Sequence, residues 1–158
     1  SIFNGPVPII ESFENTEAEI IFLKQWLKDR LEEGIEPEEI GIFVRSEAEL
    51  PRAKSAVEAT EIPYKVLDAK TSTTSGSISL CGMHLAKGLE FRAVSVMACD
   101  DEIIPSQARI EEAADMTDLE DVYKTERHLL YVACTRARDQ LLVTSVEPAS
   151  EFLDDMRV

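Results

Sequence analysis

Hydrophobic residues in this chain alternate between two kinds of spacing. Short runs in which nearly every residue is apolar predict strands buried on both faces, at residues 8–13, 40–44, 62–67, 78–81, 93–98 and 141–144. Apolar residues three and four positions apart predict helices at residues 16–33, 48–59 and 118–133. Such strands alternating with helices indicate an α/β fold of three layers, a mostly parallel sheet with helices on both faces.

The ends of the first two elements carry recognisable signals. Gly5 and Pro6 bound the first strand. Thr16 and Glu19 have the spacing of a capping box, so Thr16 is expected to cap the first helix, which should end near Gly34.

Later element ends are marked less clearly. Pro51 is expected in the first turn of the second helix, where a missing N–H does no harm. Thr117 or Asp118 is expected to cap the third helix. The acidic segment 100–121, which contains Pro105, is expected to be irregular.

Length and composition are those of one compact domain, expected over residues 1–158. The chain has 158 residues, of which 44% are apolar and 30% charged. A domain of about 150 residues hides roughly 70% of its unfolded surface, so it needs neither disulfides nor a structural metal to fold. The odd number of cysteines, 3, favours small buried residues over a disulfide framework. Polar residues 70–77 are expected to form a surface loop.

The charge balance restricts the partners of the isolated chain. A net charge of -15 opposes non-specific attraction to nucleic acid and to acidic membranes. No apolar run reaches the roughly 18 residues of a membrane span, and the N-terminus lacks the layout of a secretory signal. We therefore expect a cytoplasmic protein with no membrane partner. Because the chain begins with Ser1 rather than Met, we also expect a piece of a longer protein, or a processed or tagged chain.

Ligands of parallel sheets bind beyond the carboxyl ends of the strands, so the residues after each strand are candidates for chemistry. Arg45 follows a buried strand and is placed to meet an anion, although a plain surface arginine is the simpler interpretation. Within Met83–Phe91, Lys87 offers a positive charge, Gly88 permits a sharp turn, and Glu90 can accept two hydroxyl hydrogen bonds. That segment suits a phosphorylated sugar or, equally, a solvated turn between two strands.

The segment Glu126–Arg138 continues the helical spacing. Arg136 is expected on the inward apolar face near the helix end, where a guanidinium needs a carboxylate of this chain or an anion from outside. Arg127 and Arg138 point elsewhere and are expected in solvent or in surface ion pairs. His128 is expected to pack against the core.

Metal binding is not expected. Cys81 and His84 have the spacing of half a zinc site. The remaining candidates Cys99, His128 and Cys134 do not form the second half.

Three segments together resemble the motor core of UvrD/Rep-like superfamily 1 DNA helicases. Met83–Phe91 is similar to their motif V, written T-x-H-x-x-K-G-L-E-F, and Glu126–Arg138 is similar to motif VI, with its E-R-x-L-x-Y-V-A-x-T-R-A core. Ile42–Leu50, with the helix and strand that follow, is similar to motif IV. The order and spacing agree over nearly the whole chain, and motif VI is the most specific. The resemblance implies a RecA-like fold and the second motor domain of that family, called 2A.

The resemblance implies a nucleotide site made of five residues. Arg136 would be the arginine finger on the γ-phosphate of ATP, and Arg45 a second arginine on the same phosphate. Glu90 would hydrogen-bond the ribose, with Lys87 and Gly88 in the same nucleotide-binding loop.

The resemblance also implies contacts with DNA, and here the chain departs from the family pattern. His84 and the nearby backbone at Gly82 would lie toward single-stranded DNA or relay between nucleotide and DNA. Gly82 replaces the threonine of motif V. Val44 stands where many relatives carry an aromatic residue that stacks on adenine. The large 2B insertion of the family would fall at the loop 70–77, so we expect a relative without that subdomain.

No phosphate loop of the form G-x-x-x-x-G-K-[ST] is present, so the chain alone is not expected to hydrolyse ATP. The resemblance implies that ATP with Mg²⁺ binds in a cleft shared with an N-terminal RecA-like domain of the same polypeptide, and that the full-length protein moves along single-stranded DNA in DNA repair.

Two other interpretations remain. One is a non-catalytic acidic interaction module on a RecA-like scaffold, with its arginines tied to carboxylates of the chain. The other is the helicase-type subunit of a recombination nuclease. Convergence of Arg45 and Arg136 on one open surface favours the motor, whereas wide separation or full pairing within the chain favours the interaction module.

Overall fold

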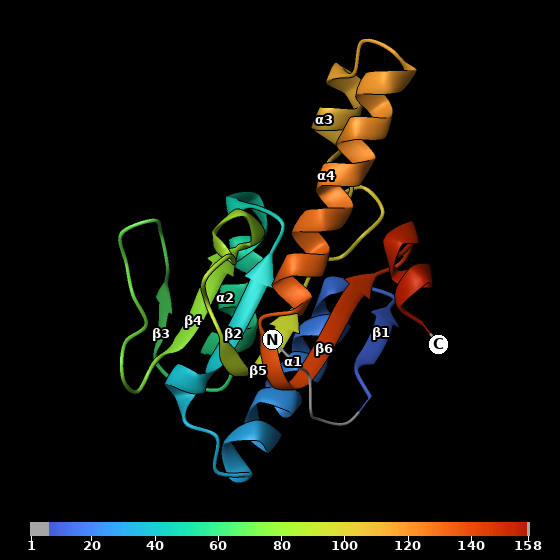
Figure 1. The fold of residues 1–158 in the computed structure, drawn as a ribbon. Helices are drawn as coiled ribbons and strands as arrows, with labels where there is room; N and C mark the ends of the chain where they lie inside the picture. Colours follow the sequence, from blue (N-terminus) through green and yellow to red (C-terminus); the bar gives the residue numbers. More distant parts are fainter. Residues whose placement is uncertain (1–6, 158) are drawn as a thin grey trace.

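The computed structural model describes residues 7–157, which form a six-stranded sheet whose neighbouring strands are all parallel (Figure 1). The order across the sheet is β1-β6-β5-β2-β4-β3. The strands are β1 (Ile9–Phe13), β2 (Ile40–Val44), β3 (Tyr64–Val66), β4 (Ile78–Gly82), β5 (Phe91–Val96) and β6 (Ala137–Val146). The expected α/β class is therefore confirmed. The predicted boundary at Gly5 and Pro6 lies outside the described residues.

Four of the six apolar runs become the inner strands of the sheet, whereas the runs at 8–13 and 62–67 form its edge strands β1 and β3, which are only partly buried. Every residue of β2 and β4 is buried, as expected for strands covered on both faces. β6 is longer than the predicted 141–144, because its first residue, Ala137, already pairs with Phe91 at the start of β5.

Helices cover both faces of the sheet. Behind it in Figure 1 lie α1 (Thr16–Glu32) and α2 (Leu50–Glu58), and in front lies α4 (Met116–Cys134). A separate apolar core fills each side. Leu23, Ile42 and Val57 belong to the core under α1 and α2. Phe43, Leu130 and Val143 belong to the core under α4. The remaining elements are α3 (Gln107–Glu112) and the short 3₁₀ turns η1 (Pro37–Glu39), η2 (Glu47–Glu49), η3 (Met83–Leu85) and η4 (Glu151–Met156).

The helix caps differ from the predicted ones. Asn15, not Thr16, caps α1, because its side-chain Oδ1 accepts the N–H of Ala18 at 2.8 Å. Glu19 is therefore free of capping, and its carboxylate is fully buried. Asp115 caps α4 two to three residues earlier than predicted.

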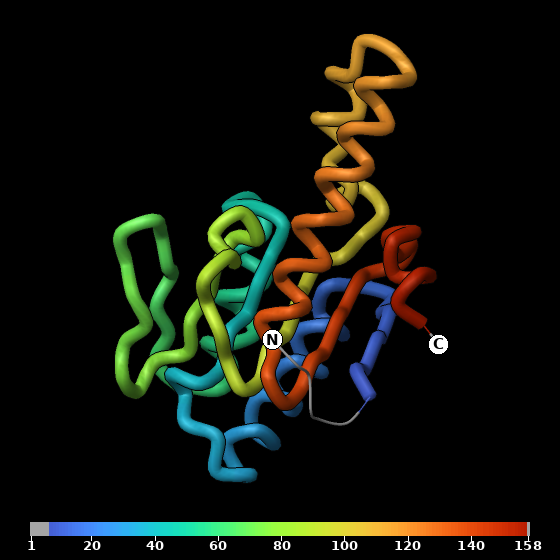
Figure 2. Tube along the Cα trace, in the orientation of Figure 1, coloured from blue at the N-terminus to red at the C-terminus, as the bar shows by residue number. Residues whose placement is uncertain are grey.

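The acidic segment 100–121 is more regular than predicted. It contains α3 and the first turns of α4, and together these project well beyond the sheet (Figure 2). Ser106 begins α3 as its N-cap. We call residues 106–125 the helical arm. The periodicity missed α3 because its six residues form less than two turns and bury no side chain.

Gly41 fixes the way in which the motif V segment enters the sheet. A Cβ at position 41 would lie 2.5 Å from the ring of Phe91, so only glycine admits the ring there. The Phe91 ring then packs edge-on against Phe43, with centroids 6.0 Å apart. The end of the segment that carries Lys87, Gly88 and Glu90 is thus held by the core.

Two smaller expectations concern membranes and thiols. No helix within residues 7–157 is long and apolar enough to cross a bilayer. Cys81, Cys99 and Cys134 are free and buried, as predicted. Burial raises the pKa of Cys81 to about 11 and that of Cys134 to about 12, so these thiols stay protonated at neutral pH.

Candidate functional site

Arg45 lies at the carboxyl end of β2 and is bound to the side chain of Glu126 on α4. Its Nε and Nη2 donate to the two carboxylate oxygens at 2.8 and 2.7 Å, a bidentate pair. The Arg45 side chain is only 16% exposed and that of Glu126 is fully buried. The simpler expectation of a plain surface arginine is therefore wrong, and the guanidinium is committed to one geometry.

Glu126 collects two further donors from the helical arm. The backbone N–H of Ser106 donates at 2.7 Å, and Nη1 of Arg109 donates at 2.9 Å. Burial raises the pKa of Glu126, but the bonds from Arg45, Ser106 and Arg109 outweigh this effect and leave the pKa below its usual value. Glu126 is therefore a buried anion at neutral pH, shared by two arginines.

Arg136 lies just after α4, at the amino ends of β5 and β6. Its Nε donates to the carbonyl of Val132 at 3.1 Å, Nη1 to the carbonyl of Leu89 at 3.2 Å, and Nη2 to Oγ1 of Thr135 at 3.1 Å. Within residues 7–157 no carboxylate pairs with it. The predicted choice between a carboxylate and an external anion was incomplete, since neutral oxygens hold the half-buried guanidinium without cancelling its charge.

The structure does not bring Arg45 and Arg136 to one surface. Arg45 follows the last residue of β2, whereas the carbonyl of Arg136 accepts the N–H of Phe91, the first residue of β5. The two arginines therefore lie at opposite ends of the parallel strands, Arg45 at the carboxyl ends and Arg136 at the amino ends. Glu126, the partner of Arg45, precedes Arg136 by almost three helical turns, about 15 Å at 1.5 Å per residue.

The motif V segment is brought together with Arg136. Gly88 has φ +90°, a conformation that favours glycine, and Leu89, whose carbonyl binds Arg136, follows it directly. Glu90 is exposed at the next position. Arg136 thus contacts this segment at Leu89, near the amino ends of β5 and β6, and Gly88 and Glu90 are the chain neighbours of Leu89.

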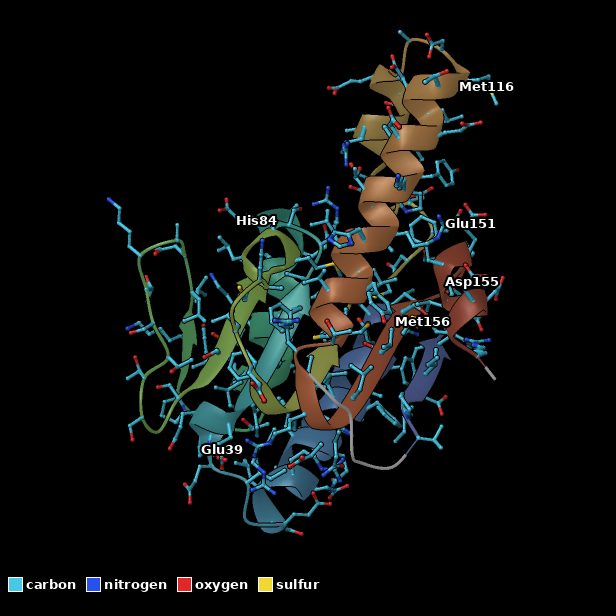
Figure 3. The ribbon with its side chains drawn as sticks, in the orientation of Figure 1. Glu39, His84, Met116, Glu151, Asp155 and Met156 are labelled. Atoms are coloured by element: carbon cyan, nitrogen blue, oxygen red, sulfur yellow. The ribbon has the colours of Figure 1, made fainter. Side chains whose placement is uncertain are left out.

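His84 and Lys87 come earlier in the same segment, after the end of β4. Both are exposed, and together with Gly88 they line a hollow of about 360 Å³ that Asp68 and Thr71 also border. Figure 3 shows His84 near the end of the sheet where β4 finishes. A positively charged side chain and an imidazole are therefore available to solvent here, opposite the loop after β3.

Two departures from the family pattern have visible structural effects. A Cβ at Gly82 would lie 2.6 Å from the imidazole of His84, so the His84 ring occupies the space that a threonine would need. Val44 is fully buried among the residues under α1 and α2. It offers no face for stacking on a base.

The remaining predicted side chains are placed as follows. Arg127 and Arg138 are exposed and form weak ion pairs with Asp155 and Asp139, at 3.9 and 3.5 Å, as expected. His128 is exposed on α4, so the prediction that it packs is wrong. It precedes Leu129, which points toward the core instead.

A metal site is absent from the part of the chain that the structure describes. No group of three or more histidine, cysteine or acidic side chains in residues 7–157 is arranged to hold an ion. Cys81 and His84 therefore remain an isolated pair.

Sequence reasoning missed a second buried ionic cluster, at the carboxyl ends of β5 and β6. Arg52 of α2 donates to the fully buried Glu19 at 2.6 Å and to Asp100 at 2.7 Å. Glu19 also accepts from Thr144 and from the N–H of Ala98. The only sequence signal for this cluster was that Glu19, an acidic residue, falls on the apolar face of α1 between Ala18 and Leu23.

Comparison with known proteins agrees with this fold and these motifs. The profile of the UvrD-like helicase C-terminal domain family matches residues 67–148, just over half of the chain. The probable DNA helicase II homolog of Rickettsia conorii is 28% identical over 157 residues, which cover 98% of this chain and 22% of that protein. The ATP-dependent DNA helicase PcrA of Bacillus subtilis is 34% identical over 88 residues, 54% of this chain and 11% of that protein.

A solved structure has the same fold. It is the C-terminal domain of a possible DNA helicase from Lactobacillus plantarum WCFS1, with a TM-score of 0.71, 23% identity, and coverage of 98% of this chain and 83% of that one. The parallel sheet and the motif-bearing segments at its edges define a domain of the helicase class. The chain belongs to the family of UvrD-like helicase C-terminal domains. It spans about a fifth of the length of the Rickettsia relatives that it matches.

Proposed function

We propose that this chain is the second motor domain of an ATP-dependent superfamily 1 DNA helicase. Arg136 supplies the arginine finger to the γ-phosphate, and Glu90, with Lys87 and Gly88 in the same loop, contacts the ribose. ATP and Mg²⁺ are held mainly by an N-terminal phosphate-loop domain of the same polypeptide. His84 and the backbone at Gly82 face single-stranded DNA.

One observation carries this proposal: Arg136 keeps an uncompensated charge in a fixed position. Three neutral oxygens orient its guanidinium, and Leu89, one of its partners, is adjacent to Glu90. A preorganised cation beside a ribose-binding carboxylate is what stabilisation of a transferring phosphoryl group needs. The other motif arginines, in contrast, pair with carboxylates: Arg45 with Glu126, Arg127 with Asp155 and Arg138 with Asp139.

Two observations favour the interaction-module alternative: Arg45 is paired with Glu126, and Arg45 and Arg136 lie at opposite ends of the parallel strands. Full pairing of the motif arginines is not found within residues 7–157, since no carboxylate there pairs with Arg136. In the motor, Arg45 is the proposed second γ-phosphate arginine, and its Nη1, which makes no hydrogen bond to residues 7–157, is the atom available for that contact.

The proposal is tested by ATP hydrolysis in the complete polypeptide that contains this chain. We expect turnover that single-stranded DNA stimulates, because DNA and nucleotide each favour the closed arrangement of two motor domains. The 158-residue chain alone should not hydrolyse ATP above the buffer rate, since it has no phosphate loop. A complete polypeptide without ATP turnover would favour the interaction module.

A further inference from the structure

Two buried glutamates each hold an arginine in this domain, but the charges of the two clusters differ in sign. At Glu126, two guanidinium groups, of Arg45 and Arg109, share one carboxylate. At Glu19, one guanidinium, of Arg52, is shared by two carboxylates. The cluster at Glu126 therefore carries an excess positive charge, and the cluster at Glu19 an excess negative one.

The two arginines of the Glu126 cluster differ in exposure: the side chain of Arg109 is 39% exposed and reaches solvent, whereas that of Arg45 is 16% exposed. Arg45 shares its one partner carboxylate with Arg109, so its charge is only partly compensated within residues 7–157. Arg45 follows β2 at the carboxyl end of that strand, where ligands of parallel sheets bind. Arg45 borders a hollow of about 380 Å³ there.

We infer that Glu126 is a positioning residue for Arg45, and that it holds the guanidinium so that its free edge meets an anionic group of the nucleotide. This inference rests on the proposed function. The bidentate bond uses Nε and Nη2 and fixes the plane of the guanidinium, which leaves Nη1 for the ligand. Ser106 and Arg109 in turn fix Glu126 from the helical arm.

The surroundings also specify the ligand's charge. Glu49 and Glu102 border the same hollow and would repel a bare polyanion. A triphosphate that brings its own Mg²⁺ carries less net charge than the free triphosphate and can approach Arg45 despite them. The cluster therefore fits a metal-bound nucleotide better than a metal-free one.

The test is the substitution Glu126→Gln in the complete polypeptide, with DNA-stimulated ATP turnover as the readout. The variant keeps the side-chain shape but loses the bidentate carboxylate. We expect kcat to fall about 10- to 100-fold, because a small misplacement of a catalytic group costs up to about 100-fold. The KM for ATP should change less than about threefold, since Arg45 acts mainly on the transition state.

Glu19→Gln is the matched control, because Glu19 is equally buried and also holds an arginine. Both variants should lower the melting temperature, but only Glu126→Gln should lower kcat. If Glu126→Gln does not fold, Glu126→Asp keeps the charge, withdraws the carboxylate by about one methylene, and should give the same loss of kcat.

A double-mutant cycle with Arg45→Lys decides whether Glu126 acts through Arg45. Lysine keeps the charge but has no planar fork, so it should lower kcat by a similar factor. The double variant should then be no slower than the slower single variant. Two results would overturn the inference and leave the proposed function intact. One is a double variant whose loss of kcat is the product of the two single losses. The other is an unchanged kcat in Glu126→Gln when Arg45→Lys is slow. Absence of turnover in the unmodified polypeptide would instead refute the proposed function.

Discussion

Replacement of Arg136 by alanine in the complete polypeptide is expected to lower kcat for ATP by at least about 1,000-fold, the range found when an arginine finger is removed. In the proposed motor, the Arg136 guanidinium is the positive charge that meets the γ-phosphate during hydrolysis. The folded state should change little, because alanine removes only bonds to the carbonyls of Val132 and Leu89 and to Thr135. Steady-state ATP turnover, with a melting curve for each protein, measures both effects.

Arg138→Ala is the control for that experiment. Arg138 is two positions further along, is 48% exposed, and has only a 3.5 Å ion pair with Asp139. Its loss should leave kcat within about twofold, since exposed pairs of this kind contribute little. Equal turnover in Arg136→Ala and the unmodified protein would remove Arg136 from the mechanism.

Arg52→Ala is expected to destabilise the domain by about 3–5 kcal/mol, the cost of leaving a buried charge without its partner. Glu19 would keep only the neutral donors Thr144 and Ala98. Asp100 would lose Arg52 as well, although it still accepts from the N–H of Val146. Urea unfolding of the 158-residue chain measures the effect, because its single tryptophan, Trp26, is buried on α1 and reports on that side of the sheet.

A surface arginine provides the comparison. Arg92 is 36% exposed and binds Asp139 at 2.9 Å. Arg92→Ala should lower the free energy of unfolding by less than about 1 kcal/mol. If Arg52→Ala and Arg92→Ala had equal midpoints in urea at the same slope, the buried cluster would not stabilise this fold.

The sheet could be predicted from the sequence because its signals are local. Residues 40–44 are apolar throughout and residues 78–81 are apolar except for Ser79, and strands of that kind are typically buried on both faces. The spacing of Leu23 and Leu27 likewise predicted the buried face of α1. The parallel direction of the strands followed from the alternation of strands and helices.

The ionic clusters could not be predicted, because their partners are far apart in the sequence. Glu19 has the spacing of a capping box with Thr16, and only the distant Arg52 shows that its carboxylate turns inward. Glu126 lies in the most specific motif, yet nothing local indicates that Arg45 and Arg109 bind it. Burial of a carboxylate depends on tertiary partners rather than on periodicity.

The position of the two motif arginines shows the same limit. The sequence places Arg45 after a strand and Arg136 near a helix end, but it does not show that the two residues lie at opposite ends of the parallel strands. A helix packed across the front face connects them through Glu126 (Figure 1).

The central claim is that Arg136 donates to the γ-phosphate of a nucleotide held by the rest of the polypeptide. A crystal structure of the complete protein with Mg²⁺ and a non-hydrolysable ATP analogue tests it most directly. The account predicts a nitrogen of Arg136 about 2.7–2.9 Å from a γ-phosphate oxygen, the usual length of a charge-assisted hydrogen bond. An Arg136 that remains on the carbonyls of Val132 and Leu89, with the nucleotide bound elsewhere, would contradict it.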